Sequence, residues 1–341
     1  MGRARLSSWE SDDGAVSGLP VRRIELPTPY AVGPVNTYLI EAEPVTLVDA
    51  GINTPQAQNA LLLQLNAAGY FPQSIERVLI THAHPDHYGL VHVLQELSGA
   101  TIFFPEREIA RVRDRQMLFE VGRLLVEAGM PLDLLFKMDQ QRRKGPRLTI
   151  DNDEVVPVRD GDIFEFKDSE EGLSFELVAH LMPGHTGGHL VYHEPHTQTL
   201  FAGDQLLPDV SPNPLLEPSL DEPGERRRSL KDYLRSLHAM SEMDLTIAYP
   251  GHGDPVTDPK KLIARTIAHH ERRKAAIADR LGDEGRSPYE IATEIYPKAS
   301  GYDSFLAVSE VVAHLDLVVE DGDADVEVID GVTYYRKATI R

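Results

Sequence analysis

The chain of 341 residues contains no cysteine, which excludes disulfide bonds, thiolate metal ligands and cysteine nucleophiles. It also has no apolar run near the roughly 18 residues that a membrane span requires. Residues 1–20 lack the apolar segment of a signal peptide and are interpreted as a flexible lead-in. These absences predict a cytoplasmic protein without a membrane partner, in which any metal would be bound by nitrogen and oxygen atoms.

Positive charge is also scarce, because 34 Lys and Arg residues stand against 54 Asp and Glu residues. The resulting formal charge of -20 disfavours long-range attraction of polyanions. A local basic patch is still compatible with this balance, so nucleic acid is a disfavoured but not an excluded partner. A small-molecule substrate is the expected partner.

Short apolar strands alternate with helical segments through much of the chain, which is typical of a layered α/β (α+β) fold. The predicted strands are 36–40, 45–51, 77–81, 101–104, 154–166, 175–179, 190–193, 199–202 and 245–249. The predicted helices are 54–69, a helix from about 89, 225–240 and 259–281, with a proline-rich loop at 208–224.

Residues 106–144 interrupt this alternation with charged, helical sequence and no strand signal. They predict two helices inserted between strands. The preferred interpretation is a solvated face, and the alternative is a lid over an active site.

The last part of the chain, 287–341, predicts a small separate domain after a linker at 282–286. Ser287, Pro288 and Glu290 form a capping box with proline at the first helical position. A second helix is expected at 305–319, and Asp330-Gly331 marks a two-residue hairpin. Helices followed by a hairpin suggest a winged-helix domain. Its acidic stretch 318–331 opposes phosphate binding and favours a packing, homodimerising or substrate-wall role.

The stretch "VLITHAHPDHYGL" (78–90) ends an apolar run with His82, His84, Asp86 and His87. A loop that leaves the end of a strand can turn several side chains toward one point. Imidazole and carboxylate groups suit zinc, iron or manganese. The cluster therefore predicts a metal site.

Three later stretches repeat the order of strand, tight turn and ligand-type residue. They place His185 in "MPGHTGGH", Asp204 in "LFAGDQL" and His252 in "AYPGHGDP". Glycine allows the positive φ and the close backbone approach that such turns require. Each of these residues could project into the same crevice as the first cluster.

The motifs H-x-H-x-D-H, P-G-H-T, G-D and Y-P-G-H-G, with "LVDAG" at Asp49, together resemble the metallo-β-lactamase-fold hydrolase superfamily. The whole chain resembles the branch of β-lactamase-like protein 2, whose members carry a C-terminal winged helix. This resemblance implies an αββα sandwich at 21–281 with the helical insert at about 106–144. The missing cysteine ligand departs from metallo-β-lactamases proper.

The resemblance implies two divalent metal ions, zinc first, with iron or manganese as alternatives. It assigns His82, His84 and His185 to one ion, Asp86, His87 and His252 to the other, and Asp204 as the bridge.

Several residues are expected to have roles other than binding a metal ion directly. Asp86 is also expected to orient the attacking hydroxide or relay its proton. Asp49 is expected to support a metal-bound histidine through a hydrogen bond. His189 is either a substrate contact or a structural histidine. His269 with Arg273 is interpreted as structural.

Two cations about 3.5–4 Å apart can share a water and lower its pKa to near 7. The sequence therefore predicts a dinuclear metal-dependent hydrolase that uses a metal-bridging hydroxide, on an ester or a thioester of the CoA- or glutathione-conjugate type. One alternative is a phosphodiesterase or endoribonuclease that acts on single-stranded RNA. Another is a non-catalytic metal-binding interaction protein.

Overall fold

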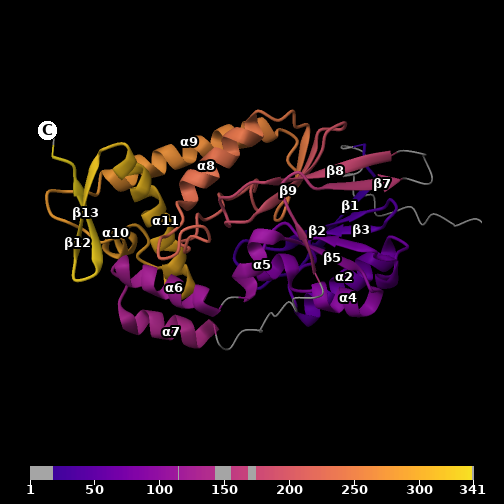
Figure 1. The fold of residues 1–341 in the computed structure, drawn as a ribbon, viewed down its shortest axis with the longest axis horizontal. Helices are drawn as coiled ribbons and strands as arrows, with labels where there is room; N and C mark the ends of the chain where they lie inside the picture. The colour runs from indigo at the N-terminus through magenta and orange to yellow at the C-terminus, as the bar shows by residue number, and fades with distance from the viewer. Residues whose placement is uncertain (1–17, 114, 143–154, 168–173, 340–341) are drawn as a thin grey trace, which may run out of the picture.

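The computed structural model describes residues 18–113, 115–142, 155–167 and 174–339. Three predicted segments lie partly outside these ranges. They are the lead-in at 1–17, the insert at 114 and 143–144, and the first residue of the strand predicted from 154. Within them, two β-sheets face each other and helices cover both outer surfaces (Figure 1). The predicted αββα sandwich is confirmed. Among the described helices, none combines the length and apolarity that crossing a membrane requires.

The first sheet is built mainly from the N-terminal part of the chain. Its order is β1 (Val21–Leu26), β2 (Val35–Ile40), β3 (Thr46–Val48), β4 (Arg77–Leu79), β5 (Thr101–Pro105) and β6 (Val155–Val158). Strands β3 to β6 are parallel, so their carboxyl ends share one edge. Helices α2 (Pro55–Ala67) and α4 (Val91–Ser98) cover the outer face, and η1 (Pro72–Ser74) precedes β4. Leu61 and Leu65 of α2 pack in one cluster with Leu47 and Val78 of the sheet.

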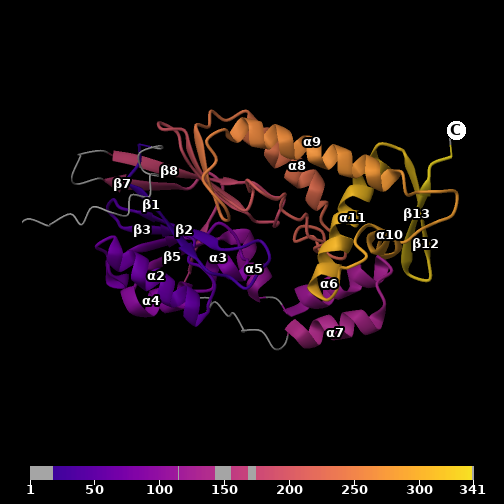
Figure 2. The ribbon, with the colours of Figure 1, turned by 180° about the vertical axis from the view of Figure 1, so that it is seen from behind.

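The second sheet has the order β11 (Ile247–Pro250), β10 (Thr199–Gly203), β9 (Leu190–Glu194), β8 (Ser174–Leu181) and β7 (Ile163–Lys167). Helices α8 (Ser229–Ser241) and α9 (Pro259–Ala278) cover its outer face (Figure 2). The stretch 154–166, predicted as one β region, in fact contributes β6 to the first sheet and β7 to the second. The chain therefore crosses between the sheets at this point.

Aromatic side chains hold the two sheets together where the site loops begin. The Tyr38 ring on β2 lies edge-on to Phe201 of β10, with ring centres 5.6 Å apart. The Tyr38 hydroxyl donates to the carbonyl of Pro250 (2.6 Å), and the Tyr192 hydroxyl donates to the carbonyl of Ile80 (2.8 Å). These bonds fix the ends of β11 and β4, which carry the residues of the predicted metal site.

The insert consists of α5 (Glu106–Arg113), α6 (Arg115–Glu127) and α7 (Leu132–Arg142). The predicted first helix is thus assigned as α5 and α6, on either side of residue 114. Leu124 and Leu125 of α6 are buried in a cluster with Phe305 and Val308 from the C-terminal helices. Helix α6 is therefore a packed element with one buried face, unlike the solvated face that the composition suggested.

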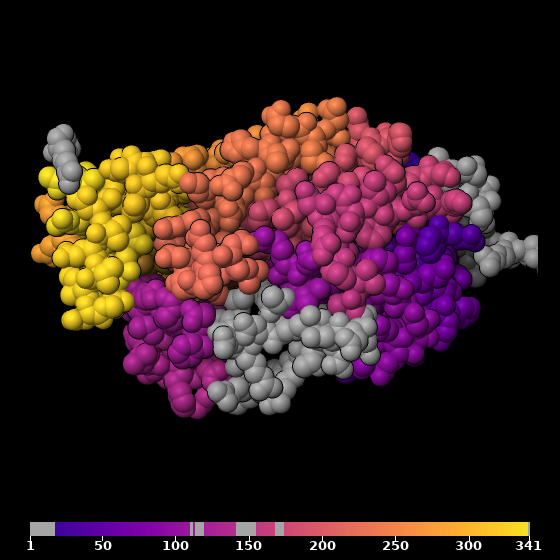
Figure 3. Space-filling view, in the orientation of Figure 1, coloured from indigo at the N-terminus to yellow at the C-terminus, as the bar shows by residue number. Residues whose placement is uncertain are grey.

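The C-terminal segment contains α10 (Pro288–Ile295), α11 (Tyr302–Glu320) and a hairpin of β12 (Ala324–Ile329) and β13 (Val332–Lys337). The capping box is present, because Ser287 Oγ accepts from the Glu290 amide and the Glu290 carboxylate accepts from the Ser287 amide. The hairpin turns at Asp330 and Gly331, both with positive φ. Together with α6 and α7, this segment forms a block at one end of the molecule (Figure 3).

The burial of α6 gives a matched test on one helix. Leu125 is 2% exposed and Phe119 is 75% exposed. We expect Leu125→Ala to lower the free energy of unfolding by about 2–5 kcal/mol, because it leaves a cavity in the cluster. Phe119→Ala is expected to change it by no more than about 0.5 kcal/mol. Urea denaturation measures both, and equal losses would contradict this packing.

Candidate metal centre

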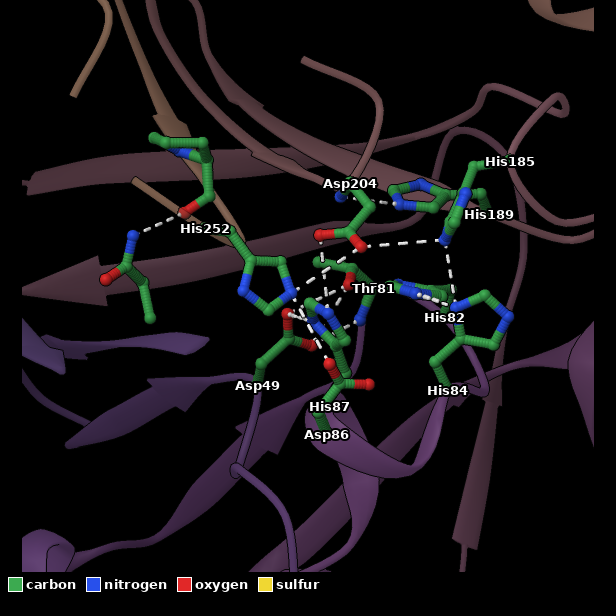
Figure 4. A network of polar contacts seen from close by, with 12 residues as sticks. Asp49, Thr81, His82, His84, Asp86, His87, His185, His189, Asp204 and His252 are labelled. Atoms are coloured by element: carbon green, nitrogen blue, oxygen red, sulfur yellow. Dashed lines mark hydrogen bonds and ion pairs between the residues drawn. The ribbon is translucent and has the colours of Figure 1, made fainter. Parts of the chain in front are cut away.

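Seven side chains from separate parts of the chain converge at the edge of the sandwich (Figure 4). They divide into two groups, and within each group the ligand atoms lie within 4.8 Å of one another. The first group is His82, His84, His185 and Asp204, and the second is Asp86, His87 and His252. The structure thus brings together every metal ligand that the sequence motifs proposed.

The local sequence explains how one short stretch supplies four of them. Strand β4 ends at Leu79, and His82 follows in the short loop that leads to α3. His84 is the N-cap of α3 (Pro85–Tyr88), and Pro85 occupies the first helical position, which its fixed φ favours. The helical turn then directs Asp86 and His87 back toward the crevice.

The first group is a tight triangle of imidazole nitrogens. His84 Nδ1 lies 3.0 Å from His82 Nε2 and 2.9 Å from His185 Nε2. His185 Nε2 is also 3.5 Å from Asp204 Oδ2. Three nitrogens facing one another at such distances are arranged around a shared point.

Asp204 connects this group with the second. Its Oδ1 lies 3.3 Å from His87 Nε2, and its Oδ2 lies 3.8 Å from His252 Nε2. Asp86 Oδ2 is 3.4 Å from the same His252 nitrogen. In Figure 4, Asp204 accordingly stands between His185 and His252. A carboxylate with contacts to both groups has the geometry of a bridge.

Hydrogen bonds on the outer side of the rings fix the tautomers of the second group. His87 Nδ1 is 2.7 Å from Asp49 Oδ2, and His252 Nδ1 is 2.6 Å from the carbonyl of Pro34. Both partners can only accept, so each Nδ1 carries the proton. In the neutral imidazole, which is the form that binds a metal, the Nε2 lone pairs of His87 and His252 therefore point at the carboxylates of Asp204 and Asp86.

The same reasoning applies to His82. The Thr81 hydroxyl donates to Asp49, which accepts it at 2.9 Å. His82 Nδ1 must then donate to Thr81 Oγ1 at 3.0 Å, and its Nε2 lone pair faces the triangle.

Lone pairs that face carboxylates and other lone pairs repel each other unless a cation lies between them. Within the described residues, the buried Nε2 atoms of His87 and His252 and Oδ1 of Asp204 have no hydrogen-bond partner. Buried polar atoms without partners are costly in a folded protein. Imidazole nitrogens and carboxylate oxygens in this arrangement fit two divalent transition-metal ions.

The electrostatics of the protein alone lead to the same conclusion. Burial raises the pKa of Asp204, but His87, His252 and His185 outweigh it and hold this pKa well below the usual range. Burial lowers the pKa of His87, but Asp204 and Asp49 outweigh it and hold this pKa well above the usual range. The buried, ionised carboxylate of Asp204 is therefore stabilised by positive charge placed next to the Nε2 atoms.

Two glycines make this convergence sterically feasible. A Cβ on Gly251 would lie 2.2 Å from Asp204 Oδ1 and 2.6 Å from His87 Cε1. Gly203, just before Asp204, has a φ of +49° and no room for a side chain beside His189. The "GD" and "PGHG" motifs thus allow ligand loops from β10 and β11 to touch.

Asp49 and His189 lie against the ligands in different ways. Asp49 accepts hydrogen bonds from His87 and Thr81, which is the supporting position that the sequence suggested. His189 is fully buried, its ring stacks on His82 with centres 4.7 Å apart, and its Nε2 accepts from the Asp204 amide. This geometry agrees with the alternative of a structural histidine.

Two further supports were not recognised in the sequence. Glu108 of α5 is 1% exposed, and its carboxylate accepts from the amides of Gly188 (2.6 Å) and Ala83 (3.4 Å). It therefore joins the loop of His185 to the loop of His82 and His84. Arg227 donates to the carbonyl of Gly184 (2.9 Å). No motif marks either residue, because each acts on a loop far away in the sequence.

The αββα fold and the two groups of candidate metal ligands together point to one class of proteins. Residues 30–252 match the family model of the metallo-beta-lactamase superfamily. The chain belongs to this superfamily.

Two of the similar proteins match the chain over more than the residues of the family model, and a third matches less of it. The chain is 34% identical over 325 residues to a protein of Bacillus subtilis (strain 168) named probable metallo-hydrolase YqjP, covering 93% of this chain and 98% of that protein. A metallo-beta-lactamase family protein of Thermus thermophilus has a similar structure, with a TM-score of 0.78 and 29% identity over 93% of this chain and 98% of that one. A hydroxyacylglutathione hydrolase of Pseudomonas entomophila is 28% identical, but over only 39% of this chain and 34% of its own length.

The position of Glu108 predicts an effect on metal retention. We expect Glu108→Gln to weaken metal binding about 10–100-fold, because one amide oxygen replaces the carboxylate that holds both histidine loops. Glu106→Gln on the same helix serves as the control, since among the described residues Glu106 pairs only with Arg159, in an exposed ion pair. Competition with a chelator measures both affinities. Equal metal affinities in the two variants would show that Glu108 does not support metal binding.

Proposed function

We propose that the protein is a dinuclear metal-dependent hydrolase. The observation that supports this most strongly is the set of fixed Nε2 lone pairs directed at Asp204 and Asp86. His82, His84 and His185 would hold one ion, Asp86, His87 and His252 the other, and Asp204 both. Two bound cations, zinc first, would supply an acidified water molecule and polarisation of the substrate oxygen.

The protein groups then orient the reaction and move its proton. Asp86 is 7% exposed, and its Oδ2 lies 3.4 Å from His252 Nε2 in the candidate metal centre. We assign to it the proton of the attacking water, which it returns to the leaving oxygen or sulfur as the acyl bond breaks. Asp49 keeps His87 in the correct tautomer throughout, and Glu108 keeps the histidine loops in register.

An ester or thioester is the substrate class that we favour. The partial similarity to a hydroxyacylglutathione hydrolase, whose name describes a thioester substrate, supports it. The formal charge of -20 also favours a small substrate over a nucleic acid.

The C-terminal segment adds an argument against RNA cleavage. We propose that α10, α11 and the hairpin are a winged-helix-like module, as in the branch of β-lactamase-like protein 2. A nucleic-acid-reading module of this kind requires an exposed second helix. Here Val311, His314 and Leu315 of α11 are among its many fully buried residues. A packing or substrate-wall role suits this burial better.

Metal analysis tests the ligand assignment directly. We expect close to two equivalents of transition metal per chain, and a loss of at least one equivalent in His84→Ala with a fall in hydrolysis of about 100-fold or more. His92→Ala is the control, because His92 is an exposed histidine that forms a surface pair with Glu96, away from the seven candidate ligands. A His84→Ala protein that stays folded and fully active would refute the assignment.

A substrate panel separates the remaining alternatives. The metal-loaded protein would be assayed on thioesters, carboxylic esters, bis(4-nitrophenyl) phosphate and short single-stranded RNA. We expect turnover of esters or thioesters that chelation abolishes. Cleavage of RNA without ester turnover would favour the endoribonuclease alternative. No turnover of any substrate at full metal occupancy would favour a non-catalytic interaction protein.

A further inference from the structure

A second group of polar side chains surrounds a cavity of about 550 Å³ between α9 and α11, apart from the seven ligands. The two helices pack against each other (Figure 1), and the turn between α10 and α11 and the loop that follows Asp204 close the cavity. His269 and Arg273, interpreted from the sequence as structural, both line it. A cavity at the junction of two structural units is a frequent place for ligand binding.

A chain of hydrogen bonds fixes the orientation of one lining group. His314 Nδ1 donates to the carbonyl of Glu310 (2.7 Å), so His314 Nε2 accepts from His270 Nδ1 (3.2 Å). His270 Nε2 must then accept from the hydroxyl of Ser211 (2.9 Å). The hydrogen of Ser211 is thus committed to His270, and only its oxygen lone pairs remain for a ligand.

Asn213 adds a second acceptor on the same loop. Its Nδ2 donates to the carbonyl of Leu306 (3.0 Å), which fixes the amide orientation. Its Oδ1 is buried and has no hydrogen-bond partner within the described ranges. Ser211 and Asn213 both line the cavity, and the side-chain oxygen of each can still accept a hydrogen bond.

The cavity also contains cationic groups with free donors. Arg273 Nε lies 3.7 Å from Glu310 Oε1, and within the described part of the chain its guanidinium makes no hydrogen bond. Lys298 forms no ion pair with any described residue. Burial raises the pKa of Glu310 to about 7 although Arg273 opposes this, so Glu310 compensates the Arg273 charge only in part. Asp303 is a second acidic residue in the lining. With two cationic and two acidic groups, this lining suits a ligand that carries both charges.

A metal ion fits this cluster poorly, although His269, His270 and Glu310 are close enough to hold one. Both ring nitrogens of His270 are already occupied, one by Ser211 and the other by His314. Arg273 also lies beside the one carboxylate of this group.

We propose that this cavity binds an α-amino acid, or the amino-acid end of a larger molecule. The carboxylate would pair with Arg273 and Lys298, and the ammonium group would donate to Ser211 Oγ and Asn213 Oδ1. A ligand with both charges binds the cationic side chains and the acceptor oxygens, whereas a simple anion binds only the cationic side chains.

Tyr233 lies between this cavity and the candidate metal centre and contacts residues next to both. Its ring centre is 5.7 Å from that of His270, and its hydroxyl donates to the carbonyl of Gln205, next to Asp204. The amino acid is therefore either the remote end of the hydrolysed substrate or a separate effector. Only the first of these sources rests on the proposed hydrolase function.

Calorimetric titration of the metal-loaded full chain with L-glutamate and with glutarate tests the proposal. We expect glutamate to bind about tenfold or more tightly than glutarate, which lacks the ammonium group. Arg273→Gln and Lys298→Gln should each weaken glutamate binding about tenfold or more, because each removes a charged donor. Arg272→Gln is the matched control, since Arg272 is exposed on the same helix and does not line the cavity.

The outcomes separate this proposal from the hydrolase proposal, since binding is measured without turnover. Failure of the wild-type protein to bind glutamate, or equal binding in all three folded variants, would overturn it even in an active hydrolase. Kinetics then identify the source of the ligand. Competition by glutamate against an ester of its own side-chain carboxylate, without an effect on 4-nitrophenyl acetate, indicates the substrate end. An equal effect on both esters indicates an effector.

Discussion

The orientation of a few imidazole rings is the constraint on which the rest of the site depends. Asp49, Thr81 and the Pro34 carbonyl occupy the Nδ1 side of three histidines, which leaves their Nε2 lone pairs directed inward at each other and at carboxylates. Such an arrangement is unfavourable without positive charge in the centre. Two divalent cations would supply this positive charge, and their binding would in turn stabilise the fold.

The sandwich makes this possible because both sheets end their strands at the same edge. Strand β4 supplies the first histidines from one sheet, while β10 and the parallel β11 supply Asp204 and His252 from the other. The hydroxyls of Tyr38 and Tyr192 bond across the core to Pro250 and Ile80, one or two residues before these loops. The position of each ligand thus depends on packing between the sheets.

The sequence predicted those parts of the molecule that local pattern encodes. The ligand-type residues follow short apolar strands and glycine turns, so His82, His185 and Asp204 could be named without coordinates. The role of Glu108 could not, because its partners Gly188 and Ala83 are reached only after the insert folds back on the sandwich. The buried face of α6 was missed for the same reason. Its apolar residues meet α11, about 180 residues later in the chain.

The insert therefore contacts both the histidine loops and the C-terminal helices. Helix α5 holds the histidine loops through Glu108, and α6 packs with the C-terminal helices that wall the cavity beside Arg273. Helix α11 is also buried against α8 and α9. Packing against α6, α8 and α9 gives the C-terminal block a structural role that requires no nucleic acid.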